Sequence, residues 1–249
     1  MNKVMIIMGK TDTGKKRTLN EDSFFAETLQ GVQLAIVCDG VGGAKGGEVA
    51  SSTAVTVFIE TFNELMQLSV NYKDILIAAV SRANDAIYSY SRESAGLSGM
   101  GTTIVACVFD GDEYHIINVG DSRLYLIDEM SSGGIRQITR DHSYVQKLLE
   151  NGTLTKKQAE VHPNKNIITS ALGLDALVEV NFYQEKYTSG IILLCSDGLY
   201  NYVDESDIQK YVSQYDNIDH CLNELVAKAN ENGGGDNITV VIMKPESRA

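Results

Sequence analysis

Apolar residues along the chain follow two different periods, and the changes of period divide it into strands and helices. Short apolar runs bounded by glycine and polar residues are typical of β-strands. Such runs predict strands at 4–8, 23–26, 35–38, 102–109, 114–119, 123–127, 135–138, 177–183, 191–195 and 238–242. The turns between 102 and 138 are tight, so we expect an antiparallel meander there.

Helical spacing, with apolar residues three to four positions apart, appears in pairs of segments between the runs of strands. Two long helices are expected after residue 44, where Phe58 and Val80 belong to the apolar stripes. Two more are expected near the C-terminus, the first opened by Asp204 and the second striped by Leu222. Paired helices between groups of strands predict an α+β fold in which helix layers cover sheets, rather than alternating β-α-β units.

Residues 139–173, called the flap segment below, depart from the strand pattern. A short helix is predicted at 144–150, with Gly152 as part of its C-terminal cap, and a second begins at the capping box from Thr155 to Gln158. The segment carries lysines and few large apolar side chains. We therefore expect it to form a small mobile surface flap rather than part of the core, placed to meet a substrate.

Composition limits the possible partners of the chain. Its 249 residues are 43% hydrophobic and 22% charged, which is ordinary for a globular protein, and the expected organisation is one domain over 1–249. The net charge of −12 argues against nucleic acid or an anionic membrane as the main partner. The 4 cysteines are scattered without a CxxC pair, so buried free thiols are expected. No apolar run approaches a signal sequence or a membrane span, and a cytoplasmic protein is expected.

Acidic residues recur where strands end beside glycine. Asp39 and Asp197 each follow a strong strand and precede a glycine, and Asp236 precedes the last strand. Each alone is an ordinary turn aspartate, because aspartate favours turns. If the strand ends converge, however, the carboxylates would repel one another unless a cation neutralised them. Oxygen ligands without clustered His or Cys favour Mg²⁺ or Mn²⁺ over zinc. Further acids at such positions are Glu21, Asp22 and Asp121.

A basic cluster precedes the first of these acids. Lys15, Lys16 and Arg17 lie four to six residues before Glu21. Such a run is usually a solvated loop, but the planar guanidinium of Arg17 is also suited to gripping a phosphate. Adjacent side chains in an extended chain point to opposite faces, so only one of Glu21 and Asp22 is expected to face a site directly.

Taken together, these short motifs resemble those of the 2C-type metal-dependent Ser/Thr protein phosphatases, and the flap segment is similar to that of the compact bacterial members. The likeness runs from about residue 11 to residue 243. It implies a four-layer α-β-β-α sandwich, with two packed antiparallel sheets each covered by helices. The motifs that carry it, in chain order, are Arg17-x-x-Asn20-Glu21-Asp22, Asp39-Gly40-Val41-Gly42-Gly43, Gly101-Thr102-Thr103, Gly120-Asp121-Ser122-Arg123, Ser196-Asp197-Gly198 and Gly235-Asp236-Asn237.

The resemblance implies two Mn²⁺ or Mg²⁺ ions held in a cleft, with a third, weaker one in bacterial relatives. It gives Asp39 the role of bridging the first two ions, with the Gly40 carbonyl contributing to one of them. It assigns Asp197 and Asp236 to the first ion. Water bridging the two ions would attack the phosphorus without a covalent phosphoenzyme.

The remaining roles also come from the resemblance. Glu21 and Asp22 would serve the second ion, one directly and one through water, and Asp121 would help to hold the third. Arg17 would anchor the substrate phosphate. Several eukaryotic members carry His where this chain has Val41, so the proton for the leaving group must come from metal-bound water or elsewhere.

The expected function is hydrolysis of phosphoserine and phosphothreonine in proteins, reversing a Ser/Thr kinase, by a monomer that binds neither nucleic acid nor membrane. Two alternatives stay open. One is a metal-dependent hydrolase of a small phosphoester. The other is an inactive regulatory module on the same fold, because a fold does not fix a function.

Overall fold

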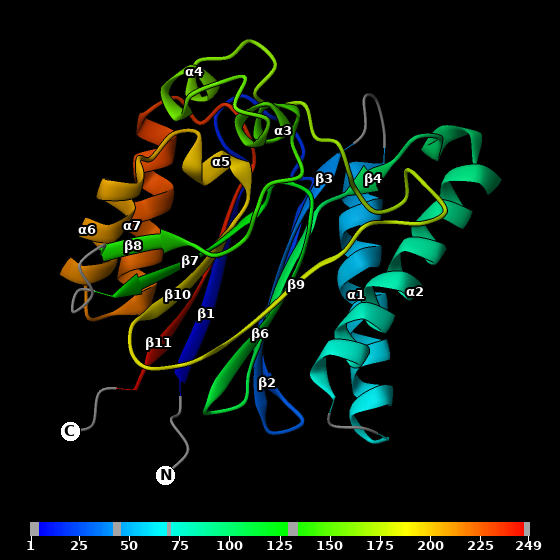
Figure 1. The fold of residues 1–249 in the computed structure, drawn as a ribbon, viewed down its shortest axis with the longest axis horizontal. Coiled ribbons are helices and arrows are strands. Elements are labelled where there is room, and N and C mark those ends of the chain that lie inside the picture. The colour runs from blue at the N-terminus through cyan, green and yellow to red at the C-terminus, as the bar shows by residue number, and fades with distance from the viewer. Residues whose placement is uncertain (1–4, 42–45, 69–70, 129–133, 247–249) are drawn as a thin grey trace.

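The computed structural model describes residues 5–41, 46–68, 71–128 and 134–246, which form two antiparallel sheets packed face to face (Figure 1). The first sheet has the strand order β1 (Met5–Asp12), β11 (Ile238–Pro245), β10 (Ile191–Cys195), β7 (Arg123–Asp128) and β8 (Gly134–Gln137). The second has the order β2 (Asp22–Leu29), β3 (Val32–Val41), β5 (Ile104–Phe109), β6 (Glu113–Val119) and β9 (Asn181–Lys186), and β4 (Gly101–Thr102) pairs with β3.

Helices cover the outer face of each sheet. Figure 1 shows α1 (Gly47–Met66) and α2 (Tyr72–Glu93) beside the second sheet, and α6 (Glu205–Gln214) and α7 (Ile218–Glu231) beside the first. The expected α+β sandwich of four layers is therefore confirmed. One core lies between the sheets, and one lies under each helix pair.

The sequence of β3 shows why this strand is central. Its residues from Val32 to Cys38 are all buried, although strand side chains alternate between faces. Leu34 and Ile36 pack in the core under α1 and α2, whereas Ala35 and Val37 pack between the sheets. A continuous apolar run is what a strand covered on both faces requires.

The prediction of an antiparallel meander between residues 102 and 138 is wrong at one connection. The hairpin of β5 and β6 forms at Asp110-Gly111, and β7 pairs with β8. However, β6 belongs to the second sheet and β7 to the first, so the chain crosses between sheets at 120–122. Gly120, with a φ of 100°, adopts the left-handed backbone needed to leave β6. The free edge of β6 is then taken by β9, which comes 62 residues after the end of β6, a partner that local sequence does not reveal.

Several boundaries also differ from expectation. The strand predicted at 177–183 begins at Asn181 and continues to Lys186, because its pairing along β6 runs from Asn118 to Glu113. Leu177, expected inside it, is 90% exposed. A short helix, α5 (Asp197–Tyr200), follows β10 and was not predicted. Of the expected features, residue 4, the glycines 42–43, residue 44 and the turn at 131–133 lie outside the described residues.

The flap segment lies across one end of the two sheets, where α3 (Tyr144–Glu150) and α4 (Lys156–Glu160) stand at the top of Figure 1. The capping box of Thr155 and Gln158 is formed as expected, and Gly152 has a φ of 69°. All 4 cysteines are buried and unpaired, as expected. Among the helices of the described ranges, none is long and apolar enough to span a membrane.

Candidate metal and phosphate site

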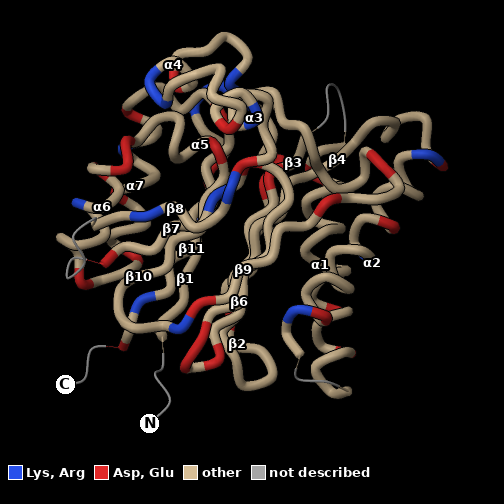
Figure 2. Tube along the Cα trace, viewed as in Figure 1, with Lys and Arg blue, Asp and Glu red and all other residues tan. Residues whose placement is uncertain are grey.

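The acidic residues singled out from the sequence come together at the end of the sheets beneath the flap segment. Asp39 lies near the end of β3 and is paired in register with Asp22, the first residue of β2. Asp197 lies two residues after the end of β10, and Asp236 lies two residues before β11, the neighbour of β10. Asp121 lies in the crossing between the sheets. In Figure 2, acidic segments gather near the upper end of β3 and at α5.

Glycine allows helix α1 to approach this end of the sheet. A methyl group on Gly40 would overlap the carbonyl oxygens of Gly47 and Glu21, so no larger residue fits there. The Gly40 amide donates to the Glu21 carbonyl at 3.1 Å. A methyl group on Gly47 would likewise meet the Glu21 carboxylate. The Glu21 side chain therefore lies against the N-terminus of α1, where the helix dipole favours a negative charge.

Neutral polar side chains fix the acidic ones in place. Ser196 donates its hydroxyl to the Asp22 Oδ2 at 2.8 Å and accepts from the Thr239 amide at 3.0 Å. Asn237 accepts from the Glu21 amide at 2.8 Å. Its Nδ2 also donates to the carbonyl oxygens of residues 13 and 19, at 2.9 Å and 3.0 Å. Asn237 thus ties the loop that carries Arg17 and Glu21 to β11.

Ser196 and Asn237 lie within the motifs named above, but no role was predicted for either residue. Their position beside Asp197 and Asp236 was the only signal available. No role was predicted for Thr102 and Thr103 either. Thr103 accepts from the Asp39 amide at 3.0 Å, and Thr102 donates to the Asp39 carbonyl at 2.9 Å.

Burial and mutual repulsion disfavour the ionised form of these carboxylates. Burial is the main cause that raises the pKa of Asp22 from 3.8 to about 6. Burial, followed by repulsion from Asp22 and Asp197, raises the pKa of Asp39 well above its usual range. The pKa of Asp197 is raised in the same way by burial and by Asp121. Burial and the charge of Asp141 raise the pKa of Asp121 to about 6.

The donor set fits a hard divalent cation. Within the described ranges, the buried oxygens Asp22 Oδ1, Asp197 Oδ1 and Glu48 Oε2 have no hydrogen-bond partner. Unpaired buried oxygens are costly, and oxygen donors are what Mg²⁺ and Mn²⁺ prefer. In the same part of the chain, no three Asp, Glu, His or Cys side chains form a ready-made ligand group. Small rearrangements of side chains would therefore accompany binding.

Arg17 supplies positive charge at this site. Its Nη2 lies 2.9 Å from Asp236 Oδ2, and its Nη1 lies 3.4 Å from Glu21 Oε2. The side chain of Arg17 is 44% exposed, so solvent reaches part of it. Lys15, by contrast, is exposed and contributes a backbone contact, from its amide to the Gly234 carbonyl.

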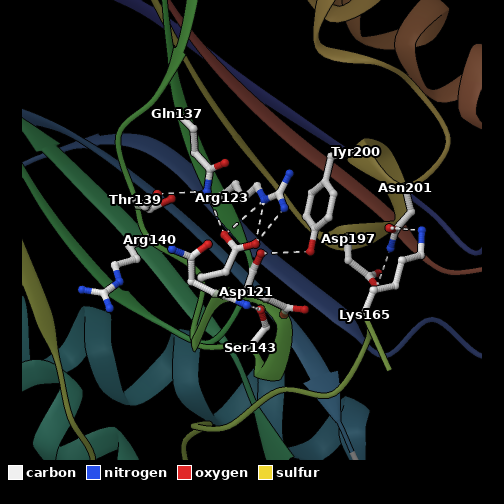
Figure 3. A network of polar contacts seen from close by, with 12 residues as sticks. Asp121, Arg123, Gln137, Thr139, Arg140, Ser143, Lys165, Asp197, Tyr200 and Asn201 are labelled. Carbon is white, nitrogen blue, oxygen red and sulfur yellow. Dashed lines mark hydrogen bonds and ion pairs between the residues drawn. The ribbon is translucent and has the colours of Figure 1, made fainter. Parts of the chain in front are cut away.

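A polar network surrounds Asp121 (Figure 3). The carboxylate of Asp141, in the flap segment, accepts from Arg123 at 2.7 Å and from Gln137 at 2.7 Å. The Tyr200 hydroxyl donates to the Asp121 carbonyl at 3.1 Å. The cavity next to this network, of about 430 Å³, lies between the flap segment and α5 to α6 and has Asp121 in its wall.

A separate contact joins the flap segment to Asp197. The Nζ of Lys165 donates to Asn201 Oδ1 at 3.4 Å, and Asn201 Nδ2 donates to Asp197 Oδ2 at 3.0 Å (Figure 3). Asn201 therefore holds one oxygen of Asp197, and the other oxygen stays without a hydrogen bond in the part of the chain that is described.

The profile of the family described as Protein phosphatase 2C matches residues 11–230. The chain is a member of the protein phosphatase 2C family. It is 37% identical over 239 residues to the serine/threonine phosphatase stp of Listeria monocytogenes serotype 4b (strain F2365), covering 94% of each chain.

Solved structures of this phosphatase family have the same fold as this chain. The serine/threonine phosphatase Stp1 from Staphylococcus aureus superposes with a TM-score of 0.90 at 32% identity, covering 99% of this chain and 97% of that one. The catalytic domain of the serine/threonine protein phosphatase PstP, in complex with 2 manganese ions, has a TM-score of 0.83 at 31% identity, over 97% and 98% of the two chains. The family, the fold and the enzyme class expected from the sequence are thus confirmed, as is dependence on a divalent metal. The roles of individual residues stay predictions.

Proposed function

We propose that this chain hydrolyses phosphoserine and phosphothreonine in proteins with the help of two divalent cations. The observation that carries the proposal is the convergence of Asp39, Asp197 and Asp236 with Glu21 and Asp22 at one end of the sheets. A hard cation would neutralise the charges that burial and repulsion disfavour at Asp22, Asp39 and Asp197, whose pKa values are raised. It would also give partners to the unpaired oxygens of Asp22 and Asp197, and Arg17 contacts Asp236 beside them.

We assign the ligands as the family resemblance implies. Asp39 would be shared by both cations, and the Gly40 carbonyl would contribute to one of them. Asp197 and Asp236 would complete the protein ligands of the first cation. Bound cations of this kind supply a hydroxide-like water at neutral pH and offset negative charge on a phosphate. Glu21 and Asp22 would serve the second cation. Their separate surroundings, Arg17 for Glu21 and Ser196 for Asp22, fit one direct and one water-mediated contact.

Asp121 would hold a third, weaker cation. It lies on the crossing between the sheets rather than on the paired strands that carry Asp22 and Asp39. A site with fewer protein oxygens binds more weakly.

Arg17 would anchor the substrate phosphate. At present its guanidinium is shared between Asp236 and Glu21. Once these carboxylates are engaged elsewhere, the two Nη groups can donate to phosphate oxygens in the same forked geometry. The exposed side of Arg17 leaves room for a substrate to approach from solvent.

The wider setting follows from the same proposal. We infer a single domain over 1–249 with the flap segment as its subdomain, working as a cytoplasmic monomer opposite a Ser/Thr kinase. The negative net charge of −12 argues against nucleic acid or an anionic membrane as a partner.

The test is hydrolysis by protein stripped of metal with EDTA. Turnover of a phosphoserine protein should appear on adding Mn²⁺ and should be absent in Asp39→Asn, which should still fold because Asn keeps the shape of the side chain. A nucleotide and p-nitrophenyl phosphate serve as small substrates. Preference for the nucleotide over the phosphoprotein would favour the small-phosphoester alternative. No Mn²⁺-dependent turnover of any substrate would favour the inactive module, and near-native turnover in Asp39→Asn would overturn the ligand assignment.

A further inference from the structure

Arg123 joins parts of the protein that are far apart in the sequence. It begins β7, two residues after Asp121. Its Nε donates to Asp141 Oδ1 and Oδ2 at 3.1 Å each, and its Nη2 donates to Asp141 Oδ2 at 2.7 Å. Its Nη1 donates to the Tyr125 hydroxyl at 3.0 Å. Each guanidinium nitrogen is therefore already engaged with protein, so Arg123 is not arranged as a second phosphate anchor.

The flat face of the same guanidinium contacts a second element. The Arg123 Cζ lies 3.7 Å from the centre of the Tyr200 ring, a close cation–π contact. The hydroxyl of that tyrosine donates to the backbone carbonyl of Asp121 (Figure 3). Arg123 thus fixes α5 at the Asp121 turn from one side and the flap residue Asp141 from the other.

The base of the flap segment, residues 140–142, also forms direct hydrogen bonds with residues 118–120, next to and within the Asp121 turn at 120–122. The His142 amide donates to the Gly120 carbonyl at 2.9 Å, and the Gly120 amide donates to His142 Nδ1 at 3.3 Å. Asn118 Nδ2 donates to the Arg140 carbonyl at 3.0 Å. A shift of the flap base therefore has to move the turn that carries Asp121.

We propose that Arg123 is a positioning residue that couples the place of the flap segment to the place of Asp121. The coupling runs through Asp141 on the flap side and through Tyr200 on the α5 side. The Asp121 carboxylate can then take the orientation that suits a cation only while the flap base is seated. A protein substrate that moves the flap would alter cation binding at Asp121, whereas a small substrate would not.

Tyr200→Phe is the sharpest test, because it removes the hydroxyl bond to Asp121 and keeps the ring under Arg123. A neutral hydrogen bond of this kind predicts that the weakest Mn²⁺ site binds about 3- to 10-fold more weakly in calorimetry. Tighter Mn²⁺ sites should be unchanged. Tyr211→Phe, which removes a hydroxyl from the Tyr211–Tyr215 ring stack, is the matched control.

Arg123→Lys tests the flap side. Lysine keeps the charge but cannot form the fork, so backbone amides of the flap base should exchange hydrogen roughly tenfold faster than in the wild type. The Michaelis constant for a phosphoprotein should rise more than that for p-nitrophenyl phosphate. A thermal melt of each variant checks that the fold is intact.

The inference rests on the proposed metal site, and the two arms separate their failures. If the wild type binds no Mn²⁺, the proposed function fails, and amide exchange at 120–122 and 140–142 still decides the coupling. Faster exchange of both segments together in Arg123→Lys would support it. Unchanged weak-site affinity in Tyr200→Phe, or loosening of the flap base without the Asp121 turn, would overturn it.

Discussion

Replacing Asp22 with asparagine separates the stability of the fold from its capacity to bind cations. The Asp22 residue is 8% exposed, and its Oδ2 accepts from Ser196. Its Oδ1 has no partner among the residues that the structure describes, and Asp39 lies opposite in register. Asparagine has the same shape and can still accept from Ser196, so the substitution mainly removes a buried charge.

The size of the effect follows from the pKa of Asp22. Burial raises this pKa from 3.8 to about 6. Each rise of 1 in the pKa corresponds to about 1.4 kcal/mol of free energy. Because the folded pKa is the higher one, the protonated form favours folding. Ionisation lowers the free energy of unfolding as the pH rises from about 4 to above about 6. At neutral pH this ionisation should lower the free energy of unfolding of the metal-free wild type by about 3 kcal/mol. Asp22→Asn has no carboxylate to ionise and should not show this loss.

Thermal unfolding in EDTA is the assay. At neutral pH, Asp22→Asn should melt about 6–12 °C higher than the wild type, and the difference should shrink toward zero near pH 4. Mn²⁺ should stabilise the wild type more than the variant. Asp216→Asn, which alters a fully exposed carboxylate, is the control and should show no such pH-dependent gain. A lower melting temperature for Asp22→Asn at neutral pH, or a gain that persists unchanged at pH 4, would refute the reasoning.

Other substitutions test the remaining assignments. Arg17→Ala should raise the Michaelis constant and weaken inhibition by inorganic phosphate, because it removes the proposed phosphate anchor; Lys15→Ala is the control, and unchanged phosphate inhibition would contradict the role. Asp121→Ala should lower activity at limiting Mn²⁺ and leave the tight sites intact in calorimetry, whereas loss of the tight sites would show a wider role. Lys156→Ala on the exposed flap helix α4 should slow phosphoprotein turnover more than p-nitrophenyl phosphate turnover, and equal effects would argue against a substrate contact.

Local pattern was enough to predict the elements whose environment is uniform. The apolar run in β3 and the stripe of α1 through Ala54 and Phe58 are buried as expected, because the run is covered on both faces and the stripe keeps one helical period. The crossing from β6 to β7 could not be predicted, because a tight turn can also lead a chain into another sheet. The start of β9 at Asn181 depends on its distant partner β6.

The candidate site shows the same division. Aspartates beside glycine at strand ends mark Asp39 and Asp197 without knowledge of the fold. The hydrogen bonds that hold the acidic residues of the site depend on which loops meet across the sheets. Asn237, for example, bonds residues more than 200 positions earlier in the chain, and Ser196 reaches Asp22 from the neighbouring sheet. Such contacts come from tertiary structure, and the sequence alone offers only the polar residue itself.

The location of the acidic site explains how the fold tolerates it. Three apolar cores, between the sheets and under each helix pair, bury most of the large side chains away from the carboxylates. Repulsion is therefore confined to the end of the sheets, near the points where the strands stop. A cation that binds there is attracted by the same negative charges that repel one another in the metal-free protein. The same arrangement that weakens the metal-free protein at neutral pH should make its affinity for divalent cations rise with pH through the titration of Asp22 and Asp121, since each of these proposed ligands must lose a proton to bind.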